Sequence, residues 1–295
     1  MYSYYNNNYQ RFQNNSKNRG RGGQKIDYST YGDWKNYYYT NYASQNFPPK
    51  YQVLPNNIMM PINNEYYIQR QILFHVEKYI YSKYPDLMEI NQQNTKLSER
   101  INPNCKFFII KALTEEDIHK SIKYGVWCSN KNGNIILDNA FNITKENNGK
   151  VYLIFTCQGT DRYVGVAEMK NNYDEKRPFD LWTQDNVWIG LFDVKWLFIK
   201  DVPFKEFNNI FMTMKEGKIK PIFYAKDTQE VPYEVAKIII EKIDKYLNSN
   251  TILEHFEYYD LRQESYEEGT KMNRNQNQSK TNDNIIKRHN ETKEN

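Results

Sequence analysis

The stretch FFIIKALTEEDIHKSIKYGVWCS, residues 107–129, decides the fold. It opens with an apolar run typical of a buried strand and continues into Thr114-Glu115-Glu116-Asp117. That combination starts a helix, because a Thr hydroxyl can accept from the unpaired N–H groups of the first turn. Gly125 is typical of a helix end, where the backbone adopts a positive φ. A strand followed closely by a helix predicts a domain of mixed α/β class.

The same alternation continues along the chain to residue 262. Further apolar runs predict three strands, at 151–155, 163–167 and 192–199, the first two separated by a turn at Gly159. Pro232 suits the first turn of a closing helix. One face of that helix is predicted to be an apolar stripe of Val235, Ile239, Ile243 and Leu247. Residues 101–262 are therefore predicted to form one mixed α/β unit.

The flanks differ from this unit in composition. Residues 1–61 are rich in Asn, Tyr, Gln and Ser, so they bury too little apolar surface to offset the entropy of ordering and are predicted to be a disordered tail. Its tyrosines and its basic patch at 19–23 favour weak self-association and sequence-blind RNA contact, and the alternative is that the Asn-rich tracts are neutral filler. Residues 65–100 are predicted to be a helical lead-in, with Pro85 stopping the first helix, and residues 263–295 a second disordered, polar tail.

Charge and cysteine usage exclude several classes of protein. The chain carries +4, but residues 1–64 hold seven basic against two acidic side chains and 263–295 hold six of each, which leaves 65–262 at −1. A domain-wide cationic clamp is thereby excluded, so phosphate contacts must be local. Cys105, Cys128 and Cys157 lack metal-ligand spacing, so neither a metal nor a cofactor is predicted, and unpaired cysteines suit a reducing compartment. Neither a secretory leader nor a membrane span is predicted.

Three tryptophans, Trp127, Trp182 and Trp188, lie outside apolar runs, in polar and loop-like settings. Three indole faces beside polar groups could enclose a flat ligand such as a nucleic-acid base. The alternative is that they plug the core under loops, since Trp is highly buried on average. The sequence around them leaves both interpretations open.

Eight motifs in order along residues 105–245 resemble the YTH domain: FFIIK at 107–111, EDIH at 116–119, SIKY at 121–124, VWCS at 126–129, LDNAF at 137–141, GVAEM at 165–169, FDVKW at 192–196 and DTQEVP at 227–232. The resemblance implies a small β-barrel-like sheet of about six strands surrounded by helices. It also implies a non-catalytic protein that binds single-stranded RNA and places N6-methyladenosine in an aromatic cage.

The resemblance also implies roles for individual residues. Trp127, Trp182 and Trp188 would form the cage, although the stretch between the last two is one residue longer than in the family. The groups facing the base would be Asp117, the backbones of Cys128 and Leu113, and Gln158. Lys111 and Lys226 would approach RNA phosphates. A Trp at the third cage position and a Cys after the first Trp resemble the cytoplasmic type of the family, although a nuclear location stays possible.

Two alternatives to a methyladenosine reader remain at this stage. A cage altered by the longer loop would give an RNA-binding protein without methyl selectivity. An enzyme acting on RNA is the third hypothesis, but the sequence has neither the H-x-E and C-x-x-C pair of a zinc deaminase nor a P-loop. Taken alone, Asp117 lies three residues after Thr114, which is the spacing of a capping box at a helix start. Lys226 taken alone would be a solvated surface charge.

Overall fold

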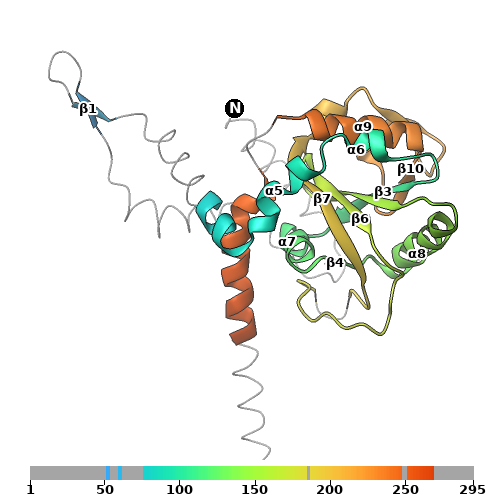
Figure 1. The fold of residues 1–295 in the computed structure, drawn as a ribbon, viewed down its shortest axis with the longest axis horizontal. Helices are drawn as coiled ribbons and strands as arrows, with labels where there is room; N and C mark the ends of the chain where they lie inside the picture. The colour runs from blue at the N-terminus through green and yellow to red at the C-terminus, as the bar shows by residue number, and fades with distance from the viewer. Residues whose placement is uncertain (1–50, 54–58, 62–75, 185–186, 248–250, 269–295) are drawn as a thin grey trace, which may run out of the picture. The chain divides into compact units, whose positions relative to one another are not determined.

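The structure is a computed structural model that describes residues 51–53, 59–61, 76–184, 187–247 and 251–268 (Figure 1). Most of the two predicted tails lies outside these ranges. Two short strands, β1 (Tyr51–Val53) and β2 (Met59–Pro61), pair antiparallel within the stretch predicted to be disordered. In this pair Tyr51 lies opposite Pro61 and Val53 opposite Met59.

A six-stranded sheet forms the centre of the domain. Its members, in the order in which they pair, are β10 (Gln229–Val231), β3 (Lys106–Ala112), β5 (Val151–Cys157), β6 (Arg162–Met169), β7 (Phe192–Pro203) and β4 (Val126–Trp127). Strands β3 and β5 run parallel, and the other neighbours are antiparallel. The predicted strands correspond to β3, β5, β6 and β7, whereas β4 and β10 were not predicted.

The sheet is curled into a half-barrel because its central strands are bulged. The pairing of β6 shifts against β5 near Phe155 and against β7 near Gly165 and Val166. Bulges bend a strand and increase its twist. At one of these bulges β6 lies very close to β7. A glycine is needed there, because a Cβ on Gly165 would lie 2.1 Å from the carbonyl oxygen of Phe198. The mixed α/β, half-barrel fold agrees with the fold predicted from the sequence.

Helices pack around this sheet (Figure 1). Helix α7 (Glu115–Tyr124) contacts β3 and β4, α8 (Lys131–Glu146) contacts β5, and α9 (Tyr233–Lys245) contacts β3 and β7. Helix α7 begins at Thr114 and ends at Gly125, as predicted, with φ of 64° at the glycine. The apolar stripe on α9 includes Ile239 and Ile243, but Leu247 lies beyond the helix end and is 97% exposed.

Short elements complete the fold. They are α5 (Pro85–Gln93), α6 (Leu97–Arg100), η2 (Phe204–Phe207), the hairpin of β8 (Phe211–Thr213) and β9 (Ile219–Pro221), η3 (Ile222–Tyr224) and η4 (Ile252–His255). Pro85 ends the helix at 76–83, as predicted, and occupies the first turn of α5, where its missing N–H costs nothing. Among the described residues, no helix has the length and apolar composition needed to cross a membrane.

The two helices at the ends of the domain meet at one buried carboxylate. Residues 256–268 are helical, so the predicted boundary at 262 falls inside a helix. Asp260 on this helix is fully buried and accepts from Tyr79 Oη at 2.5 Å and Tyr84 Oη at 2.7 Å. On α7, Lys123 Nζ lies 2.6 Å and His119 Nε2 3.1 Å from the same carboxylate. The lead-in and the C-terminal helix are therefore fixed against α7.

Candidate functional site

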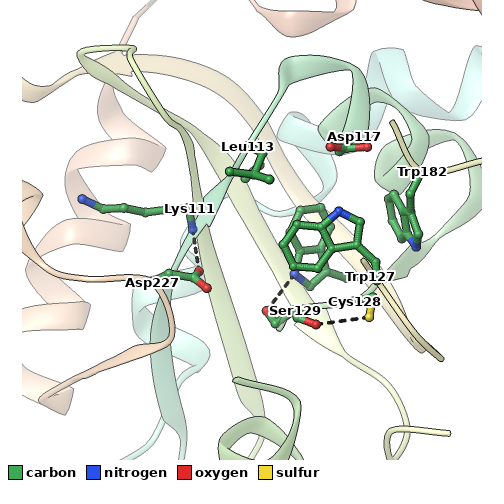
Figure 2. Close-up of a pocket in the computed structure, with 10 residues that line it drawn as sticks. Lys111, Leu113, Asp117, Trp127, Cys128, Ser129, Trp182 and Asp227 are labelled. Carbon is green, nitrogen blue, oxygen red and sulfur yellow. Dashed lines mark hydrogen bonds between the residues drawn. The ribbon is translucent and has the colours of Figure 1, made fainter. Parts of the chain in front are cut away.

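One pocket collects most of the residues predicted to form a site (Figure 2). They come from the end of β3, the first turn of α7, the end of β4, the loop before β7 and the turn before β10. The lining consists of Lys111, Ala112, Leu113, Asp117, Trp127, Cys128, Ser129, Trp182, Trp188 and Asp227. Residues up to 116 positions apart in the sequence thus border one cavity.

Two of the tryptophans meet edge to face. The ring centroids of Trp127 and Trp182 are 5.6 Å apart, with 75° between the ring planes. Trp127 also contacts the core ring of Phe155, and the ring centroids of Phe179 and Trp182 are 4.7 Å apart. Both tryptophans are nearly buried, at 5% and 6% exposure. The indole N–H of Trp182 is buried without a hydrogen-bond partner, an arrangement that costs about 1–3 kcal/mol.

The turn after β4 holds Trp127 and Cys128 in place. The indole N–H of Trp127 donates to Ser129 Oγ at 3.2 Å, as Figure 2 shows. The side chain of Asn134, buried in α8, accepts from the backbone N–H of Ser129 at 2.8 Å and donates to its carbonyl at 3.0 Å. These bonds fix the backbone at Cys128, whose thiol lies 3.2 Å from the carbonyl of Ile189.

Asp117 connects α7 to the loop that carries Trp182. Its Oδ1 accepts from the backbone N–H of Thr183 at 2.9 Å, and its Oδ2 accepts from the hydroxyls of Thr183 and Thr114, each at 2.8 Å. Burial raises the pKa of Asp117, and these hydrogen bonds oppose the rise without cancelling it. The backbone N–H of Asp117 in turn donates to Thr114 Oγ1, so Thr114 is the N-cap of α7, while the Asp117 carboxylate bonds to the two threonines.

Trp188 is the least enclosed of the three tryptophans. It is half-buried, and its neighbours Val187 and Ile189 are 50% and 57% exposed. The segment is held after Trp188, where the carbonyl of Ile189 accepts from Tyr173 Oη at 2.7 Å. Gly190 follows with φ of 71°, in a turn where any Cβ would contact backbone.

Lys111 and Asp227 form the opposite side of the pocket. Asp227 Oδ1 accepts from the backbone N–H of Lys111 at 2.9 Å, and the Lys111 side chain is directed away from the tryptophans (Figure 2). Its ammonium donates to the carbonyl of Phe223 at 3.3 Å. Burial lowers the pKa of Lys111 and raises that of Asp227.

The structure brings together seven of the nine residues named from the sequence. Gln158 and Lys226 are not in the lining: the Gln158 side chain is exposed, and the Lys226 ammonium pairs with Glu216. Sequence reasoning missed the lining residues Ala112, Ser129 and Asp227, and it missed Asn134 behind them. The available signal for Asp227 was its position immediately after Lys226, in a motif already identified.

The enclosed space is small. Its volume is about 10 Å³, which is about the minimum that holds one water molecule. Apolar rings on one side and polar groups on the other suit a ligand with an apolar substituent on a hydrogen-bonding edge. Within the described ranges, no three His, Cys, Asp or Glu side chains are grouped so that they could hold a metal ion.

Comparison with known proteins places this site in a family. Residues 105–244 match the family model described as YTH, the YT521-B-like domain. The chain is 42% identical over 172 residues to YTH domain-containing family protein 1 of Mus musculus and 41% identical over 181 residues to family protein 2 of Homo sapiens. These matches cover 58% and 61% of this chain but only 30% and 31% of the relatives.

A solved structure with a similar sequence is also known. The YTH domain of the Zygosaccharomyces rouxii MRB1 protein, in complex with N6-methyladenosine RNA, is 30% identical to this chain. The match covers 50% of this chain and 92% of that domain, with a TM-score of 0.46. The family model and the curated relatives, at identities of about 40%, name the same domain. Residues 105–244 of this chain therefore form a YTH domain.

Proposed function

We propose that this protein is a non-catalytic reader of N6-methyladenosine in single-stranded RNA, and that it regulates the fate of mRNA. The observation that carries the proposal is the small cavity bordered by Trp127, Trp182 and Trp188 within the YTH region. The solved relative bound to N6-methyladenosine RNA supports the choice of ligand.

The cage would recognise the methyl group by excluding water from it. A methyl group cannot form hydrogen bonds, so its recognition relies on dispersion and on transfer from water, which together contribute about 0.8 kcal/mol or somewhat more. We therefore expect a preference for methylated over unmethylated RNA of about tenfold. One enclosed base and a few phosphate contacts should give micromolar affinity.

The polar side of the pocket would read the adenine edge. We assign the backbone carbonyl of Cys128 as acceptor for the remaining N6 hydrogen and place Asp117 near N1. Leu113 would contribute only its backbone, because its side chain cannot form hydrogen bonds. The backbone N–H of Gln158 donates to the carbonyl of Ala112 at 2.9 Å. Because Ala112 lines the pocket and Gln158 does not, Gln158 would act at the margin of the site.

Phosphates would be contacted from the side of Lys111. This residue borders the pocket, and Lys226 lies next to Asp227 in the adjacent turn. Because Lys226 is paired with Glu216, its contact with RNA requires exchange of one partner for another. Such contacts add affinity without reporting on the base.

A second candidate function is RNA binding without methyl selectivity. The observation in its favour is the closed cage: rings that meet edge to face around about 10 Å³ leave no slot for a purine. The loop with Trp182 must shift for a base to enter, and its buried, unpaired indole N–H makes the closed position less stable. If the loop opened without re-forming a cage, the base would bind but the methyl group would not be recognised.

The test is a calorimetric titration with two RNA 9-mers that differ only in the N6-methyl group of the central adenosine. A reader should bind the methylated strand about tenfold more tightly, and Trp182→Ala should remove that difference. Trp182→Phe retains a ring and serves as the matched variant with partial selectivity. Equal binding of both strands by the parent protein would support the second candidate, and no binding would refute both.

Two further parts of the proposal concern the class and location of the protein. We infer that it has no catalytic activity, since the groups around the pocket are arranged to enclose and hydrogen-bond a base. Incubation with methylated RNA should return the RNA unchanged by mass spectrometry. We also infer a cytoplasmic location, supported by Cys128 after the first Trp and by Trp188, and fluorescence microscopy of the tagged chain tests it.

A further inference from the structure

A second exposed aromatic feature lies beside the pocket, on the short helix η3. Tyr224 at its end is 60% exposed, and Phe211 and Ile219 of the β8–β9 hairpin are 52% and 72% exposed. The preceding Phe223 is only partly exposed and stacks on Phe204 at 5.3 Å with 13° between the planes. An aromatic anchor thus holds the turn while the next ring, Tyr224, faces solvent.

The backbone under Tyr224 is rigid. Ile222 is fully buried, and its N–H donates to the carbonyl of Ile210 at 2.9 Å. Ala225 is also fully buried and closes the turn with a bond to the carbonyl of Ile222. Because Ile222 and Ala225 are both buried, the backbone that carries Tyr224 is fixed before a ligand binds. Little backbone entropy is therefore lost on binding.

The same segment is continuous with the pocket. Lys111, which lines the pocket, donates to the carbonyl of Phe223, and Asp227 is three residues after Tyr224. Three residues span at most about 11 Å. Adjacent nucleotides in a stacked strand are about 3.4 Å apart, so Tyr224 is one to three nucleotides away from a base held in the pocket.

The surroundings of Tyr224 are basic, although the domain as a whole is not. Residues 211–226 contain four lysines and one glutamate. The Lys220 ammonium lies 5.9 Å from the centre of the Tyr224 ring. An exposed ring with cations around it is complementary to a base joined to phosphates, whereas an apolar protein partner would leave those lysines without counterions.

We propose that Tyr224 is a stacking platform for the base of a nucleotide that flanks the methyladenosine, with Lys220 contacting the adjoining phosphate. This inference rests on the proposed function, because the strand is positioned by the base in the pocket. Stacking on one aromatic ring is independent of base identity, so the subsite extends affinity and adds no methyl selectivity.

The experiment compares Tyr224→Ala, Tyr224→Phe and the parent with the methylated and unmethylated 9-mers. Tyr81→Ala removes an equally exposed tyrosine from the lead-in helix and serves as the control. Tyr224→Ala should weaken both 9-mers at least about fivefold, since base stacking contributes about 1 kcal/mol or more. Tyr224→Phe and Tyr81→Ala should bind within about twofold of the parent.

Two further ligands locate the contact. Free N6-methyladenosine nucleoside reaches only the pocket, so its affinity should be the same for the parent and Tyr224→Ala. Among methylated 9-mers that each lack one flanking base, the strand missing the stacked base should bind the parent and Tyr224→Ala equally. A parent that shows no methyl preference would refute the proposed function. A selective parent with an unaffected Tyr224→Ala variant would refute only the stacking platform.

Discussion

Replacing Asp117 with asparagine should tighten the binding of methylated RNA at pH 7 by up to about 1 kcal/mol, or about fivefold. Adenine N1 is an acceptor, and an ionised carboxylate can only accept, so the parent needs a bridging water or a protonated Asp117. An amide donates to N1 directly. It also removes one negative charge from a surface that RNA approaches.

The structure indicates that the substitution is tolerated. With the amide oxygen at the position of Oδ1, the bond from the Thr183 N–H is kept, and Nδ2 can donate to the Thr183 hydroxyl. The Thr114 hydroxyl can turn to Thr183 Oγ1, 3.4 Å away. One of three bonds is then weakened, at a cost of about 1 kcal/mol. Removal of a buried charge offsets that cost, so the melting temperature should change by less than about 4 °C.

The affinity difference between Asp117→Asn and the parent should depend on pH. Because the pKa of Asp117 is raised in the folded protein, its neutral form is favoured as the pH falls, and a protonated carboxyl can donate as the amide does. The affinity advantage of Asp117→Asn should therefore shrink as the pH is lowered from 7. Glu116→Gln, one residue away and paired with Lys120, controls for loss of charge alone. A well-folded asparagine variant that binds no more tightly than the parent would remove Asp117 from base reading.

Three other predictions concern the cage, the phosphates and the buried carboxylate. Trp127→Ala and Trp182→Ala should both abolish the methyl preference in calorimetric titration, and full selectivity in either variant would contradict the cage. Trp127→Ala should also lower the free energy of unfolding by about 3–5 kcal/mol, because its ring packs in the core. Lys111→Glu and Lys226→Glu should weaken methylated and unmethylated RNA equally and reduce the salt slope, whereas a loss confined to the methylated strand would exclude phosphate contact. Burial alone would raise the pKa of Asp260, but hydrogen bonds from four side chains lower it, so its stabilising contribution should be lost as the pH falls below about 4. Asp260→Asn should cost about 3–5 kcal/mol at pH 7 and lose less further stability on acidification, as melting curves would show.

Apolar runs in the sequence were sufficient to predict the four long strands of the central sheet, and capping residues predicted the ends of α7. Long apolar runs located β3, β5, β6 and β7, and Thr114 with Gly125 located both ends of α7. Strands of two or three residues, such as β4 and β10, carry no period and form only because a neighbouring strand supplies their hydrogen bonds. Leu247 continued the apolar spacing but lies after the helix has ended.

The site was predictable to a different extent. Its lining residues were found through ordered motifs, whereas the closed geometry of the cage was not. The edge-to-face packing of Trp127 and Trp182 depends on tertiary contacts of the Trp182 loop: Phe179 packs on Trp182, and Asp117 of α7 holds the next residue, Thr183. The sequence could not show that Lys111 lines the pocket while Lys226 does not, because the pairing of Lys226 with Glu216 is a tertiary contact.

The Asp260 contacts also constrain the order in which the domain is assembled during synthesis. Lys123 and Asp260 are 137 residues apart. At about 5–20 residues per second, the ribosome needs roughly 7 to 27 s to make that interval. Until then α7, the helix that carries Asp117, lacks the carboxylate that holds Lys123 and His119 at its rear. Strands β3 to β7 are all synthesised by residue 203, but the wall of the pocket becomes fixed only after residue 260 has left the ribosome.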